Sequence, residues 1–185
     1  MTLISATTAH GRRVVLAALS AGLLSACASS PMDATNPVPA ALVPSDGQRP
    51  AFTWHSVGSQ VYDCRADGKG RWAWVFVAPE ADLFNPRGEK VGTHGAGPHW
   101  AALDGSKIIG TVKARADGQR ATDIPLLLLS TTSTGASGKL ASVTSVQRLN
   151  TVGGSAPAQG CDARSDVGKR IKAGYSADYV FFTAK

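Results

Sequence analysis

The feature of this sequence that most limits its fold is an alternation of apolar and polar side chains with a period of two, found in several separate segments. Successive side chains of an extended chain point to opposite faces, so this pattern is that of β-strands with one buried face. The segments are also rich in β-branched and aromatic residues, which suit the pleated surface of a sheet. The predicted strands are residues 59–64, 71–78, 107–116, 124–134, 142–152 and 175–184.

Short glycine-containing sequences separate the predicted strands. They are ADGKG, NPRGEK, LDGSK, ADGQR and TGASGK. An Asp-Gly pair supplies the positive φ angles of tight hairpins, so consecutive strands are expected to be antiparallel neighbours. The sequence therefore predicts an all-β fold, either an antiparallel β-sandwich or a closed β-barrel of about seven or eight strands.

Helical structure is predicted at one place in this β-rich part of the chain. Residues 79–84 have the sequence PEADLF. Pro79 suits the first position of a helix, and Glu80 and Asp82 would lie near its positive end. These residues are therefore expected to form a single helical turn.

The N-terminal residues have the pattern of an export signal. Arg12 and Arg13 precede an apolar run that is too short to remain as a membrane-spanning helix. The run ends in LSAC, which resembles the lipobox of bacterial lipoproteins, whose cysteine receives a diacylglycerol. This predicts a lipoprotein signal peptide over residues 1–26 and a lipidated Cys27 at the mature N-terminus. Acyl chains would anchor the protein, and Ala28 indicates sorting to the outer membrane, with the domain periplasmic or surface-exposed.

The next residues have the composition of a linker. Residues 27–50 are rich in alanine, serine and proline and show almost no periodicity. Such a segment is expected to be an extended tether. The domain organisation predicted from the sequence is therefore a signal peptide (1–26), a lipidated tether (27–50) and a β-rich domain (51–185).

Two cysteines remain once Cys27 is assigned to lipid. Cys64 and Cys161 would lie in an oxidising compartment, where an even pair of cysteines usually forms a bridge. A redox or metal-thiolate site would bring a C-x-x-C motif or a third ligand nearby, and the sequence has neither. A structural disulfide between Cys64 and Cys161 is therefore predicted.

The charge balance argues against nucleic acid as a partner. Removing residues 1–26 takes two arginines from the 19 basic residues and nothing from the 13 acidic ones, which leaves a net charge of +4. The basic residues are scattered among acidic ones, whereas a nucleic-acid site needs a basic stripe with interleaved aromatic residues. The partner predicted from the sequence is the membrane, through the lipid anchor.

The stretch GTHGAGPHW, residues 92–100, holds two of the three histidines that follow Cys27. One interpretation is structural: His94 donates a hydrogen bond to a backbone carbonyl, Gly95 and Gly97 take positive φ, and Trp100 fills the core. The alternative is a metal or ligand site. Its candidate residues are His94, His99, Asp104, Glu80 and Trp100, because zinc and copper sites combine imidazole with carboxylate ligands.

Several ordered motifs resemble a known family. They are APEADLF (78–84), GTHGAGPHW (92–100), DGS (104–106), IPLLLL (124–129), QRLNTVGGSAPAQGCD (147–162) and YSADYVF (175–181). Over residues 60–182 the chain resembles an uncharacterised exported family of bacteria and fungi, domain of unknown function thirty-four fifty-five. The resemblance implies an exported β-rich domain and supplies no catalytic residues. His94 fits the family pattern, whereas His99 departs from it at a position where threonine is common.

These observations predict a lipid-anchored envelope protein that acts as a non-enzymatic binding or envelope-associated module. No cofactor is predicted, and the sequence does not identify a small-molecule or envelope partner. The alternative is a metal-dependent enzyme or metal-binding protein whose site gathers His94, Asp104 and Glu80.

Overall fold

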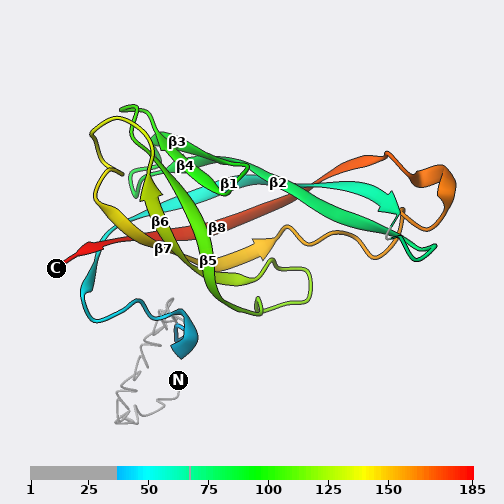
Figure 1. Cartoon of the computed structure of the whole chain (residues 1–185), viewed down its shortest axis with the longest axis horizontal. Helices are drawn as coiled ribbons and strands as arrows, with labels where there is room; N and C mark the ends of the chain where they lie inside the picture. Colours follow the sequence, from blue (N-terminus) through cyan, green and yellow to red (C-terminus); the bar gives the residue numbers. More distant parts are fainter. Residues whose placement is uncertain (1–36, 67) are drawn as a thin grey trace, which may run out of the picture. The chain divides into compact units, whose positions relative to one another are not determined.

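The structure of the protein, a computed structural model, describes residues 37–66 and 68–185. Within this range eight strands form a closed barrel, in which each strand pairs antiparallel with the next and β8 pairs back with β1 (Figure 1). The all-β prediction is confirmed. Of the two architectures left open by the sequence, the closed barrel is the one adopted.

The strands follow one another around the barrel in chain order. They are β1 (Gln48–Ala66), β2 (Trp72–Phe84), β3 (Lys90–Gly95), β4 (His99–Ala102), β5 (Lys107–Ala116), β6 (Leu126–Ser133), β7 (Val143–Gly153) and β8 (Arg170–Ala184). Two short 3-10 helices accompany them in the described residues, η1 (Ala40–Leu42) and η2 (Arg164–Asp166). No helix in the described part of the chain is long and apolar enough to cross a membrane.

Three strands continue beyond the barrel as an extension, which is called the arm. It consists of residues 61–66 of β1, 72–78 of β2 and 170–173 of β8 (Figure 1). The pairing of β1 with β2 continues to Ala66 and Trp72, whereas β3 pairs with β2 only from Ala81 onwards. Within the arm, β3 therefore does not pair with β2.

The predicted disulfide is present. Cys64 and Cys161 are bonded, with their Cα atoms 5.5 Å apart, and both residues are buried. The bond links the arm portion of β1 to the loop that leads from β7 towards β8. It joins residues separated by 97 positions in the sequence.

Aromatic and aliphatic side chains that point into the barrel form its core. Residues two apart on a strand share a face, which explains why Tyr179 and Phe181 of β8 both point inward. The core cluster consists of Trp54, Leu83, Trp100, Ile108, Leu129, Leu140, Val143, Val146, Tyr179 and Phe181. Trp100 contacts both Tyr179 and Phe181 with the rings at steep angles, an arrangement that aromatic pairs prefer.

The residues before β1 lie against the barrel. Leu42 of η1 is completely buried, and η1 contacts β5 and β6. The side-chain amide of Gln147 donates a hydrogen bond of 2.6 Å to the Leu42 carbonyl. β1 begins at Gln48, before the start of the β-rich domain at residue 51 that the sequence indicates. Burial of one leucine side chain is the physical reason that this part of the chain packs on the domain.

One local prediction was wrong, and one strand-forming segment was missed. Residues 79–84 do not form a helical turn but continue β2, where Pro79 pairs with Gln60. Proline is tolerated here because the opposite edge of β2 is unpaired before Ala81. The stretch 92–100 was not among the predicted strands but contributes to β3 and β4, joined by a tight turn. The signal peptide, the lipobox and Cys27 lie outside the described residues.

Candidate functional site

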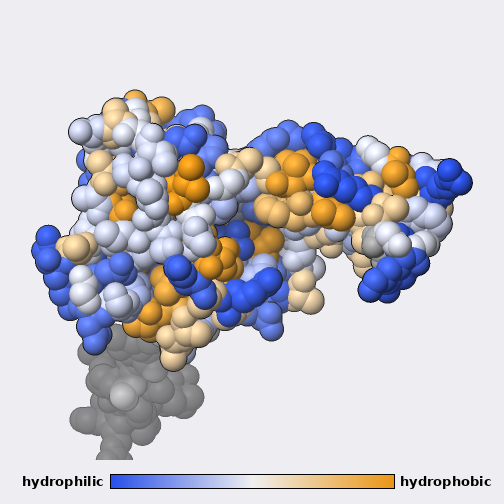
Figure 2. All heavy atoms as spheres, viewed as in Figure 1, coloured by the Kyte–Doolittle hydropathy of each residue, from blue (hydrophilic) through white to orange (hydrophobic). Residues whose placement is uncertain are grey.

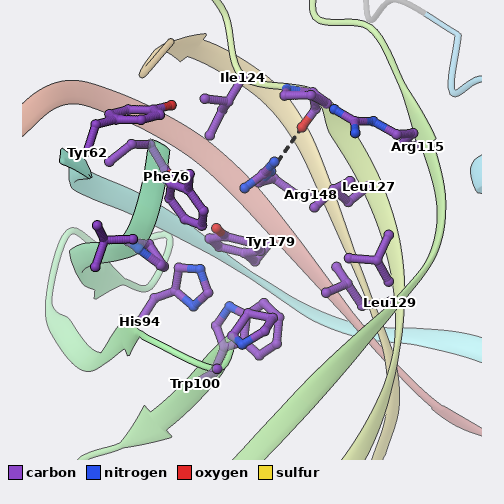
Figure 3. A pocket seen from close by; sticks show the side chains of 17 residues that line it. Tyr62, Phe76, His94, Trp100, Arg115, Ile124, Leu127, Leu129, Arg148 and Tyr179 are labelled. Atoms are coloured by element: carbon purple, nitrogen blue, oxygen red, sulfur yellow. Dashed lines mark hydrogen bonds between the residues drawn. The ribbon is translucent and has the colours of Figure 1, made fainter. Parts of the chain in front are cut away.

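The barrel interior contains a cavity next to the core. Its volume is about 460 Å³, within the range of pockets that hold small molecules. Eight-stranded barrels are just wide enough for side chains to fill or for one small ligand to occupy. The residues that line the cavity are Gln60, Tyr62, Phe76, Val77, Pro79, His94, Gly97, Pro98, Trp100, Val112, Arg115, Ile124, Pro125, Leu127, Leu129, Arg148 and Tyr179 (Figure 3).

The cavity has an inner and an outer end. At the inner end Trp100, Tyr179 and Leu129 are each only 1% exposed and belong to the core cluster. At the outer end Phe76 and Val112 are each 50% exposed. Figure 2 shows apolar atoms gathered on the surface along β2, the strand that carries Phe76. A molecule can therefore enter from the side on which the arm leaves the barrel.

Three buried polar atoms of the lining have no hydrogen-bond partner among the described residues. They are Nε2 of Gln60, Nε1 of Trp100 and the hydroxyl oxygen of Tyr179. A buried polar group without a partner costs about 1–3 kcal/mol, so native structures rarely leave three of them around one space. Their concentration around this cavity leaves hydrogen-bonding groups beside it that a polar group could use.

Arg148 supplies the charge of the inner lining. Its Nε donates a hydrogen bond of 3.0 Å to the Pro125 carbonyl, which positions the guanidinium over the cavity (Figure 3). The guanidinium and the Tyr179 hydroxyl point toward each other. Burial raises the pKa of Tyr179 far above its usual value, and the nearby charge of Arg148 partly opposes this rise. The hydroxyl therefore stays protonated and can donate a hydrogen bond.

His94 of β3 lies beside this group and is neutral. Its Nδ1 is 2.7 Å from the carbonyl oxygen of His99, so Nδ1 carries the proton and Nε2 is left as an acceptor. Its ring stacks on Trp100 at 4.7 Å between centroids, with an angle of 19° between the planes. Burial lowers the pKa of His94 to about 3, because the protonated ring would lose its hydration.

The structural interpretation of the histidine stretch describes His94 and Trp100 correctly. His94 bonds to a backbone carbonyl, and Trp100 is buried in the core. Gly97 has a φ of +85° in the turn between β3 and β4, as expected, but Gly95 has no positive φ. A Cβ at Gly95 would lie 2.7 Å from the His99 ring across the hairpin, so a larger residue there would require that ring to move.

The candidate metal ligands do not form a metal site, although His94 and Glu80 both line one hollow beside β2 and β3. His94 faces the barrel interior, whereas the His99 ring bonds to the Ala96 carbonyl at 2.7 Å. Asp104 accepts hydrogen bonds from the backbone N–H groups of Ser106 and Lys139. Glu80 is exposed and forms an ion pair of 2.6 Å with Lys172. The described residues hold no group of three or more histidine, cysteine, aspartate or glutamate side chains that could bind a metal ion.

Most of the lining residues were not candidates in the sequence. Trp100 and His94 were, but Gln60, Arg148 and Tyr179 were not. The alternation of side chains in β7 does indicate one of these residues, Arg148. Arg148 lies two residues after Val146 and therefore shares its inward face, which places a charged side chain at a position expected to be apolar.

Comparison with known proteins supports the resemblance drawn from the motifs. The sequence profile of a family described as Protein of unknown function (DUF3455) matches residues 44–183. No curated protein and no solved structure matches the chain. The matched range extends from before β1 into β8 and includes every residue that lines the cavity. The chain therefore belongs to the DUF3455 family of proteins of unknown function.

Proposed function

We propose that the domain is a non-enzymatic binding module that holds a small, largely apolar molecule inside the barrel. The observation that carries this proposal is the cavity of about 460 Å³, with a mostly apolar lining and three unpaired polar atoms. An apolar wall with a few polar groups in fixed positions is typical of small-molecule sites. The outer end is partly exposed, which gives a ligand a route of entry.

The lining favours binding over catalysis. Catalysis of acyl or glycosyl transfer needs a nucleophile next to a base, or a pair of carboxylates. The cavity lining contains no aspartate, glutamate, serine or cysteine, and its histidine is neutral and held by a backbone carbonyl. The geometry gives no support to the metal-dependent alternative around His94, Asp104 and Glu80.

Binding of a neutral fluorescent probe tests this proposal. The protein is titrated with N-phenylnaphthylamine, whose emission rises when it leaves water, and we expect saturable binding to one site. Leu127→Trp adds bulk to a half-buried lining position and should weaken binding by about tenfold or more, because the larger side chain occupies the space of the probe. The control is Ile109→Trp, which adds the same ring to an exposed position of β5 outside the lining.

Two results would contradict the proposal. One is the absence of saturable binding to the native protein. The other is an equal loss of affinity in Leu127→Trp and Ile109→Trp, which would place the probe outside the cavity. Circular dichroism of both variants shows whether each retains the β-rich fold of the native protein.

We also propose that the mature protein is a lipoprotein of the cell envelope, anchored in the outer membrane through Cys27. The supporting observation is the LSAC sequence after a short apolar run that two arginines precede. The membrane then limits diffusion of the binding module and holds it near apolar molecules of the envelope.

Mass spectrometry of the protein from a bacterial host tests the anchor. We expect an N-terminus at Cys27 with the added mass of a diacylglycerol and an acyl chain, and recovery of the protein in the membrane fraction. Cys27→Ser should abolish both the lipid and the cleavage. An unprocessed leader in the native protein, or cleavage without lipid, would contradict this proposal.

A further inference from the structure

We propose that the ligand of the cavity is an amphipathic carboxylate, an apolar molecule whose negatively charged group lies against Arg148 and the Tyr179 hydroxyl. This inference rests on the proposed function, because it names the class of molecule that the same cavity holds. Three properties of the lining support it: its charge, its hydrogen-bonding groups and the position of its apolar walls.

The charge of the lining is positive and uncompensated. The lining includes Arg148 and Arg115 and no acidic residue. No ion pair joins either arginine to a carboxylate among the described residues. A guanidinium beside apolar walls is costly without a counter-charge, and Arg148 is half-buried there. A ligand carboxylate would supply the missing charge.

The polar groups at the inner end are mainly donors. The indole N–H of Trp100 can only donate, and the Tyr179 hydroxyl, which lies close to Tyr175 and Arg148, is protonated and can donate. The guanidinium of Arg148 has N–H groups beyond the one that bonds Pro125. A carboxylate offers two oxygens with about four lone-pair sites and accepts such donors without competing for their protons. A ligand amine or ammonium would add further donors and leave these groups unpaired.

The apolar walls fix the orientation of the ligand. The unpaired donors of Trp100 and Tyr179 lie at the buried inner end, while Phe76, Val77 and Val112 line the partly exposed outer end. The carboxylate therefore points inward, and the apolar part of the molecule extends toward the base of the arm. Arg115 is exposed at the outer end, where its charge attracts anions from solution.

Displacement of N-phenylnaphthylamine by three molecules with similar apolar chains tests the inference. Decanoate, decanol and decyltrimethylammonium differ in the head group, and the alkyl chain of decanoate is one methylene shorter, which works against the expected preference. We expect decanoate to displace the probe at a concentration about tenfold lower than decanol, because a charge-assisted hydrogen bond adds affinity, and we expect the ammonium compound to be weakest. The same ligands are titrated directly by calorimetry, which does not depend on the probe.

Variants of Arg148 test whether its guanidinium causes the preference for decanoate. Arg148→Gln should remove the preference for decanoate and leave the affinity for decanol unchanged. Arg148→Lys keeps the charge and should retain part of the preference. Tyr179→Phe should weaken decanoate binding by about threefold through loss of one donor. The control is Arg87→Gln, which removes the same charge from an exposed ion pair in the turn after β2 and should leave the preference intact.

The outcomes separate this inference from the function on which it rests. If the native protein binds probe and decanol but shows no preference for decanoate, the cavity is a binding site and the carboxylate inference is overturned. The inference is also overturned if the Arg148→Gln variant prefers decanoate over decanol as strongly as the Arg87→Gln variant does. If neither probe, decanol nor decanoate binds, the proposed function itself is wrong. Urea unfolding of both glutamine variants verifies that each measurement is made on folded protein.

Discussion

His94 shows how one side chain connects the fold to the cavity. It reaches from β3 to the His99 carbonyl across the hairpin, stacks on Trp100, and contacts the ring of Tyr179 at 5.0 Å between centroids. Two of these rings carry the unpaired polar atoms of the inner lining. The neutral His94 ring therefore helps to hold in place the groups that would contact a ligand, and its protonation would disturb them.

The pH dependence of stability is expected to contain a contribution from His94. Its pKa is about 3 in the folded protein and about 6.5 in an unfolded chain, so between these values the unfolded state binds a proton that the folded state does not. Unfolding free energy therefore falls as the pH falls through this window, by about 1.4 kcal/mol per pH unit where the difference is one full proton. Above this pH window His94 is neutral in both states and does not make the unfolding free energy depend on pH.

The variant His94→Asn isolates this contribution, because its amide N–H can replace the Nδ1 donor but does not titrate. Urea unfolding at a series of pH values above 4.5 avoids the range in which the carboxylates of Asp63 and Asp166, with pKa values of about 2, begin to lose their stabilising contacts. We expect a smaller slope in the variant, even though its stability is lower at every pH. Equal slopes in the two proteins would mean that His94 is not buried as a neutral ring.

At the scale of the elements, each long strand was predicted over at least part of its length, as β1 was over residues 59–64, and the two short strands were not. Residues 107–116 were predicted as a strand, and β5 has these bounds. β3 and β4 were missed because they are short and lie in a glycine-rich stretch, where local composition favours a loop. Pairing with β2 and β5, which lie on either side of the hairpin, makes these residues strands. Tertiary contacts of this kind leave no local pattern in a sequence.

The cavity was the least predictable part of the candidate site. Alternation shows which residues of one strand share a face, and it places Arg148 inward with Val146. It does not fix the register that sets Arg148 of β7 opposite Tyr179 of β8, nor does it show that Trp100 of β4 lines the same cavity. Histidines attracted attention in the sequence because they are rare, whereas the unpaired donors could be recognised only from burial and contacts.

At the scale of the whole molecule, the disulfide holds the loop after β7 against the arm. Two hydrogen bonds act beside it: the Tyr62 hydroxyl donates to the Gly154 carbonyl at 2.8 Å, and Nε1 of Trp74 donates to the Gln159 carbonyl at 3.0 Å. Tyr62 also lines the cavity. The bond between Cys64 and Cys161 thus connects the stability of the arm to the shape of one cavity wall.

Removal of the disulfide is expected to destabilise the whole domain. The two cysteines are 97 residues apart in the sequence. The chain-entropy account assigns a stabilisation of roughly 4–5 kcal/mol to a bond that closes a loop of this size. Cys64→Ala with Cys161→Ala should therefore lower the unfolding free energy in urea by about this amount, and alanine avoids placing an unpaired hydroxyl in a buried position. Amide hydrogens of the arm should exchange faster, because the loop no longer holds β1 at this end. A reductant should lower the stability of the native protein by a similar amount and leave the stability of the double variant unchanged. Equal sensitivity of the two proteins to the reductant would show that the bond does not provide this stability.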